Sequence, residues 1–146
     1  MKLTLTIALA LTTLGLAIAP AAQALERVKM RTLGGFVTFH VPAENTCFDP
    51  GERFRTKATF RRDRTAVGRT ARPLKVQFLR EGRRQRTDRR APFAYAIGVP
   101  DDAGLGRLEY SLRMQVRTRP GGGTSRTWVQ LDRHVLIQPK TWASCA

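Results

Sequence analysis

The stretch from Arg107 to Arg117, RLEYSLRMQVR, constrains the fold of this chain more than any other. Its apolar residues are Leu108, Tyr110, Leu112, Met114 and Val116, and a charged or polar residue separates each from the next. This period of two predicts a β-strand with one buried face. The turn signal PGGG at 120–123 and a second alternating run at 129–137 follow, so the two runs together predict a long hairpin.

Shorter alternating runs predict the other strands, at 36–41, 53–61, 75–80 and 93–97, and the run at 53–61 has a basic outer face. Residues 83–90 predict either a polar edge strand or an exposed loop, 43–51 a turn, and 62–73 a loop. No structure is predicted for the charged segment 25–33. About seven short strands with frequent turn signals indicate an antiparallel β-sandwich, with a small barrel as the alternative.

The segment from Leu74 to Val116 resembles bacterial immunoglobulin-like domains. The similarity rests on three phrases, KVQFLREG, APFAYAIGV and GRLEYSLRMQV. It implies a single immunoglobulin-like antiparallel sandwich, and it bears on fold rather than function. The chain departs from that pattern in two ways. It lacks a cysteine pair bridging the sheets around a tryptophan, and Tyr110 lies too far from Asp102 for the usual tyrosine corner.

The first 24 residues predict a cleavable signal peptide. Lys2 gives the charged start, a short apolar run follows, and Ala22-Gln23-Ala24 is a small-x-small cleavage site. The apolar run is short for a membrane span, so we expect no transmembrane anchor after cleavage and one domain at 25–146. The protein is therefore expected in the periplasm or outside the cell.

The remaining chain has two cysteines, Cys47 and Cys145, and an exported pair usually forms a disulfide. An immunoglobulin-like topology places two segments at the same end of the sandwich. They are the turn after a first strand at 36–41 and the chain that follows a last strand at 128–137. Cys47 lies in that turn and Cys145 follows that exit, so the bond is geometrically reasonable.

The charge is strongly positive, +15 for the full chain, and 15 Lys or Arg residues fall between Arg53 and Arg90. Such a field attracts anions. The alternative is that arginine-rich composition only keeps a secreted protein soluble.

The same topology places the loop 62–73 beside the loop 117–127. Arginine binds carboxylate or phosphate oxygens in pairs, so we expect an anion-binding surface where these loops converge. Its residues would be Arg62, Arg64, Arg69, Arg72, Arg117, Arg119 and Arg126, extended by Arg83, Arg84, Arg86, Arg89 and Arg90 if these lie nearby. The alternative is two solvated basic loops.

Other candidate residues favour structural roles. The glycines at 121–123 suit a hairpin tip and lack the ending of a phosphate loop. Trp128 and Trp142 are expected to pack rather than to stack on a ligand. His40 and His134 have no ligand-spaced partner, so no metal is expected, and Asp101-Asp102 is expected to form a turn.

These observations predict a non-enzymatic binding module without a cofactor, because no nucleophile motif is present. Its expected partner is an anionic polymer, such as an envelope polysaccharide or nucleic acid, a lipid head group, or an acidic protein surface. The alternative is a structural or assembly component of the envelope that interacts through sheet edges. Oligomeric state does not follow from the sequence.

Overall fold

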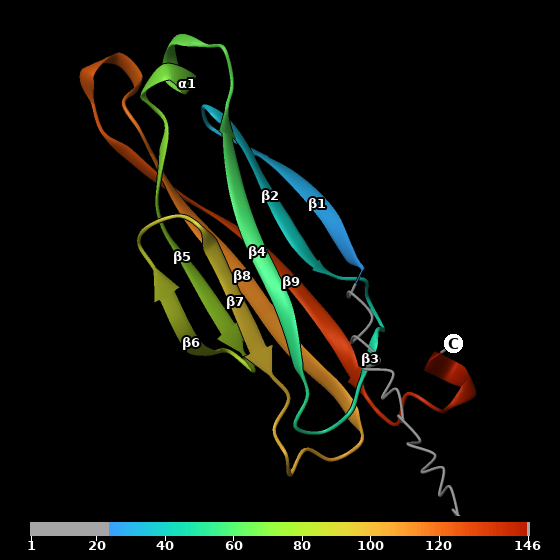
Figure 1. The fold of residues 1–146 in the computed structure, drawn as a ribbon. Helices are drawn as coiled ribbons and strands as arrows, with labels where there is room; N and C mark the ends of the chain where they lie inside the picture. Colours follow the sequence, from blue (N-terminus) through green and yellow to red (C-terminus); the bar gives the residue numbers. More distant parts are fainter. Residues whose placement is uncertain (1–23, 146) are drawn as a thin grey trace, which may run out of the picture.

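The computed structural model describes residues 24–145 (Figure 1), so the predicted signal peptide lies outside the described residues except for Ala24. One sheet has four antiparallel strands in the order β1-β2-β4-β7. These strands are β1 (Leu25–Thr32), β2 (Gly35–Pro42), β4 (Arg53–Arg62) and β7 (Phe93–Gly98).

The second sheet has five strands in the order β3-β9-β8-β5-β6. They are β3 (Cys47–Phe48), β5 (Arg72–Arg80), β6 (Arg83–Asp88), β8 (Gly106–Thr118) and β9 (Ser125–Ile137). Strand β3 runs parallel to β9, and the other pairs are antiparallel. The helical segments are short: α1 (Ala66–Thr70) and two 3₁₀ turns, η1 (Pro120–Gly122) and η2 (Ala143–Cys145).

This strand order is that of an immunoglobulin-like sandwich. β4 pairs with β7 in one sheet, β5, β8 and β9 form the centre of the other, and the chain crosses between sheets from β2 to β3. The predicted fold class is therefore confirmed, and two separate sheets exclude the barrel alternative. β1 is an additional strand that pairs with β2 along its whole length, from Leu25 opposite Pro42 to Thr32 opposite Gly35.

The core lies between the two sheets and contains the predicted inward face of β8. Its five apolar residues, from Leu108 to Val116, are each at most 4% exposed. Three aromatic rings connect the layers, because Phe54 of β4 lies 5.0 Å from Phe48 and 4.9 Å from Tyr110 between ring centroids. Burial of such rings accounts for much of the stability of a sandwich.

Several segments differ from their predicted state. The turn predicted at 43–51 contains β3, and the loop predicted at 62–73 contains α1 and the start of β5. Thr65 caps the N-terminus of helix α1, because its hydroxyl accepts a hydrogen bond from the Gly68 N–H at 3.0 Å. With five residues it is too short to leave a helical period in the sequence. Residues 83–88 form the edge strand β6, one of the two predicted alternatives.

The predicted disulfide between Cys47 and Cys145 is present and joins β3 to the C-terminal tail. The two cysteines are 98 residues apart in the sequence, and their Cα atoms are 5.6 Å apart. Disulfides are typical of proteins from oxidising compartments. Among residues 24–145, no helix has the length and apolar character needed to cross a membrane.

Candidate anion-binding surfaces

The two arginine-bearing loops lie next to each other, at the end of the sandwich that carries α1 (Figure 1). The Arg119 N–H donates to the Thr70 hydroxyl at 2.9 Å, which ties the β8–β9 hairpin to α1. We call this region the arginine end, and it comprises Arg62, Arg64, Arg69, Arg72, Arg117, Arg119 and Arg126. The glycines at 121–123 form the tip of the hairpin, and Gly121 and Gly122 have positive φ angles.

Three residues of the arginine end form a row across the outer face of the five-stranded sheet. Arg72 of β5 is opposite Arg117 of β8, which is opposite Arg126 of β9. Directly opposed residues have Cβ atoms about 5 Å apart, and like charges in such positions destabilise a sheet. The Arg117 Nε is buried without a hydrogen-bond partner among the described residues. The row therefore lowers the stability of the sheet.

The arginine end has a rigid base. Gly34, in the β1–β2 turn, has φ +82°, and a Cβ at this position would lie 2.9 Å from the Ala71 Cβ and 3.3 Å from the Thr118 Cγ2. The turn thus packs against both α1 and the end of β8. The nearby carboxylate of Asp63 accepts hydrogen bonds from the Thr65 N–H and hydroxyl, so it caps the loop.

The arginines of β6 do not extend the arginine end as a group. Arg83 is opposite Arg80 at the far end of β5, about 26 Å along the strand from Arg72. Arg86 forms an ion pair with Asp88 at 2.6 Å and lies over the Tyr95 ring. Arg84 is paired with Leu79, and Arg89 and Arg90 follow the end of β6. Because β6 runs antiparallel to β5, Arg83 and Arg84 lie furthest from the arginine end, and Arg89 and Arg90 lie closer to it.

A second basic surface covers the outer face of the four-stranded sheet, and we call it the basic face. Alternation places seven exposed cations there: Arg27, Lys29 and Arg31 of β1, and Arg53, Arg55, Lys57 and Arg61 of β4. None of the outward positions of these four strands carries a carboxylate. The predicted site missed this surface. The basic side of β4 was visible in the sequence, but β1 was not predicted as a strand.

His40 lies at the centre of the basic face. It is opposite Arg27 on one side and Lys57 on the other. Partial burial, and then the charges of Arg27 and Lys57, lower the pKa of His40 below its ordinary value of 6.5. The imidazole is therefore harder to protonate than a free histidine, first because of burial and then because of the two neighbouring cations.

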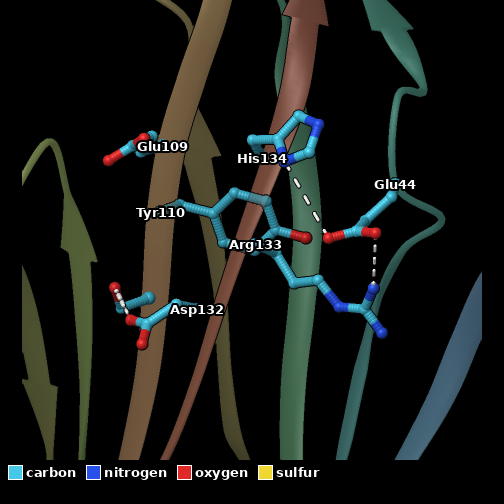
Figure 2. Close-up of a pocket in the computed structure, with 7 residues that line it drawn as sticks. Glu44, Glu109, Tyr110, Asp132, Arg133 and His134 are labelled. Carbon is cyan, nitrogen blue, oxygen red and sulfur yellow. Dashed lines mark hydrogen bonds and ion pairs between the residues drawn. The ribbon is translucent and has the colours of Figure 1, made fainter.

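A small pocket of about 220 Å³ lies by β8 and β9 (Figure 2). Figure 2 shows Glu44 reaching towards both Arg133 and His134, with oxygen–nitrogen distances of 3.3 Å and 3.8 Å. The Ser111 hydroxyl donates to Asp132 at 2.6 Å, on a different carboxylate. The same Asp132 oxygen also accepts a hydrogen bond from the Gln130 side-chain amide at 2.8 Å. These groups hold one another in place.

The Tyr110 ring is buried at the base of this pocket. Its hydroxyl has no hydrogen-bond partner among the described residues, and burial raises the pKa of Tyr110 above its ordinary value. Arg133, beside it, also forms an ion pair with Glu26 of β1 at 3.4 Å. This pair spans the open side of the sandwich between β9 and β1.

The remaining candidate residues have varied surroundings. Trp128 and Trp142 are 39% and 47% exposed, so neither ring is fully buried. The Trp128 ring lies near the cations of Lys75 and Arg113 on the outer face of the five-stranded sheet. Asp101-Asp102 lies in a turn, as predicted. Between residues 24 and 145, no cluster of His, Cys, Asp or Glu has an arrangement suited to a metal ion.

Comparisons with known proteins add little beyond the fold. No family model matches the chain, and no curated protein matches it. Among solved structures, the chain is similar to the fibronectin(III)-like modules of Clostridium thermocellum CbhA, with 19% identity and a TM-score of 0.44. That match covers 70% of this chain and 96% of the other. The fold class therefore stands on the strand order, and function has to be argued from the surfaces.

Proposed function

We propose that this protein is an exported, non-enzymatic binding module for an anionic partner and that the arginine end makes the contact. The observation that carries the proposal is the row Arg72, Arg117 and Arg126, in which three like charges lie directly opposite one another. A stable fold does not require such a row, because it lowers stability. Phosphate, sulfate or carboxylate groups bound between the guanidinium groups would remove the repulsion.

The lack of competing carboxylates supports this proposal. The ion pairs among residues 24–145 involve Arg86, Arg133, His134 and Lys140, and none involves a side chain of the arginine end. The guanidinium groups there are therefore available to a ligand. Export is supported by the disulfide and by the predicted signal peptide.

The test compares two variants with equal loss of charge. One replaces Arg62, Arg64, Arg69 and Arg72 with Ser, and the matched control replaces Arg83, Arg84, Arg89 and Arg90 with Ser. Binding is measured to lipopolysaccharide, heparin, DNA and a neutral glucan, each across a salt series. We expect the first variant to lose binding to the preferred anion and the control to retain it. Equal losses in both would show that only the overall field acts, and the proposal would fail.

The open edge of β9 favours a second candidate function, in which the protein assembles with others by strand pairing. β9 pairs with β8 along its whole length. On its other side, only Leu136 and Ile137 have strand partners within residues 24–145, namely Cys47 and Phe48 of β3. The remaining backbone groups of that edge form a template for another strand.

Under this function, replacing Gln130 with Pro would prevent complex formation with an envelope partner, because Gln130 is exposed and alternation along β9 places its backbone N–H on the open edge. The four Arg→Ser changes of the arginine end would not prevent it. Pull-down of cross-linked complexes from the secreting cell measures both effects. The opposite pattern would exclude edge pairing.

A further inference from the structure

The cations of the basic face form two parallel lines. Arg27, Lys29 and Arg31 follow β1, and Arg53, Arg55, Lys57 and Arg61 follow β4, with β2 between the two strands. Alternate residues of a strand are roughly 7 Å apart, and the two lines are separated by two strand spacings, about 9.5 Å. The line on β4 runs from Arg53 to Arg61, about 26 Å along the strand, and Arg61 is followed directly by Arg62 of the arginine end.

We propose that the basic face binds a linear acidic polysaccharide that lies along β1 and β4 and reaches the arginine end. The inference rests on the proposed function, because it names the chemical class of the anionic partner and the surface along which it runs. A compact anion would contact two or three of these cations. A chain with a negative group on most of its sugars contacts both lines at once.

The surroundings of the two lines favour a polysaccharide over a nucleic acid. Binding of single strands relies on aromatic side chains on which bases stack. The basic face has one outward ring, Phe36, and the ammonium group of Lys29 lies over it, 4.2 Å from the ring centroid. Beside β4, a depression of about 460 Å³ is lined by Arg55, Lys57, Ala94 and Ala96 among others. It offers a sugar ring small apolar side chains between two cations.

Three variants test the proposal. The face variant replaces Arg27, Lys29, Lys57 and Arg61 with Gln, the end variant is the arginine-end variant described above, and the matched control replaces Arg83, Arg84, Arg89 and Arg90 with Gln. The probes are heparin fragments of graded length, inorganic sulfate and single-stranded poly-dT, each measured across a salt series. Circular dichroism establishes that each variant is folded.

We expect affinity for heparin fragments to rise with length until the fragment spans the line on β4, about 26 Å, and then to level off. The face variant should bind the long fragments on the order of a hundredfold more weakly, and its salt slope should fall by about 3 units for four lost contacts. The control variant should change little.

The wild-type protein provides a second readout that needs no substitution. A polyanion over Arg27 and Lys57 would offset their effect, so the pKa of His40, followed by NMR, should rise when a long fragment binds. His134 serves as the internal control, because it lies on the other sheet, with its ring hydrogen-bonded to Asn45 at 2.8 Å.

Two results would overturn this inference while leaving the proposed function intact: the end variant alone loses binding, or affinity is independent of fragment length. Tighter binding of poly-dT than of heparin would replace the polysaccharide with a nucleic acid. If the face, end and control variants all weaken binding equally, both proposals fail.

Discussion

The two ends of the sandwich differ in how their charges are balanced and in how the chain is held. At the arginine end, seven arginines lie on two loops and on the strand ends that flank them, and the carboxylate of Asp63 accepts hydrogen bonds from Thr65. At the other end, the disulfide closes the tail onto β3, and charges of both signs lie close together. There Glu52 accepts the Asp49 N–H at 3.0 Å and forms an ion pair with Lys140.

This difference bears on whether the high positive charge is merely compositional. A bias towards arginine would place unbalanced cations at both ends and on both outer faces. Instead, the carboxylates are concentrated away from the arginine end and the basic face, for example at Asp49, Glu52, Asp101 and Asp102. One end of the sandwich thus carries unbalanced cations and the other carries mixed charges, so folding does not require this segregation of charge. It favours a binding role for the arginine end.

The largest expected effect is on the disulfide end. Replacing Cys47 and Cys145 with Ser should lower the free energy of unfolding by about 2 to 4 kcal/mol, because the bond closes a long loop in the unfolded chain. Urea unfolding measures the loss. At temperatures where the variant is folded, affinity for heparin should be unchanged. A fall in affinity would mean that the two ends are coupled.

At the arginine end, Gly34→Ala should lower stability by about 1 to 3 kcal/mol, because a left-handed backbone and contact with Ala71 both oppose the new Cβ. Gly82→Ala is the matched control. Its φ is +70°, but nothing lies within 4 Å of the new Cβ, so it incurs only the backbone strain. Equal losses of urea midpoint would contradict the close packing beneath the arginine end.

Arg126→Gln should raise the free energy of unfolding by about 0.2 to 1 kcal/mol at low salt, since it removes a like charge opposite Arg117. Lys140→Gln, at the other end, should lower it by up to about 1 kcal/mol, since the pair with Glu52 is lost. Both effects should shrink as salt rises. Effects of the same sign would remove the electrostatic contrast between the ends.

The smallest effect concerns His40. Because its pKa is lowered in the folded state, the unfolded chain binds more protons below pH 6.5. Its contribution to stability is therefore complete above that pH and is lost as the pH falls through the folded pKa. Thermal midpoints of wild type and His40→Gln, compared from about pH 8 to about pH 5, should show a steeper decline for wild type. Parallel curves would contradict a lowered pKa of His40 in the folded protein.

Much of the fold could be predicted because burial leaves a period of two in the sequence. In β8, every second residue is apolar and buried, and the hairpin glycines mark its end. β1 gave no such signal, because its inward position 26 is a glutamate that pairs with Arg133 rather than an apolar residue. β3 has two residues and α1 has five, so neither is long enough to show a period.

The proximity of the two arginine-bearing loops could be predicted from strand topology alone. Two loops at one end of a sandwich are neighbours whatever the register of the strands. The basic face could not. Its second line of charge requires knowing that Arg27 aligns through His40 with Lys57, a lateral register between three strands. Nothing local in the sequence specifies which strand lies beside which.

The disulfide between Cys47 of β3 and Cys145 also holds the C-terminal tail at one end of the sandwich. Leu25 starts β1 opposite Pro42, on the side where β2 finishes, and Cys145 is tied to Cys47 on that same side (Figure 1). Both ends of the described chain thus point away from α1. A copy grafted to a solid support through either end would stand with its guanidinium groups facing the solution, so all copies in such a layer would share one orientation.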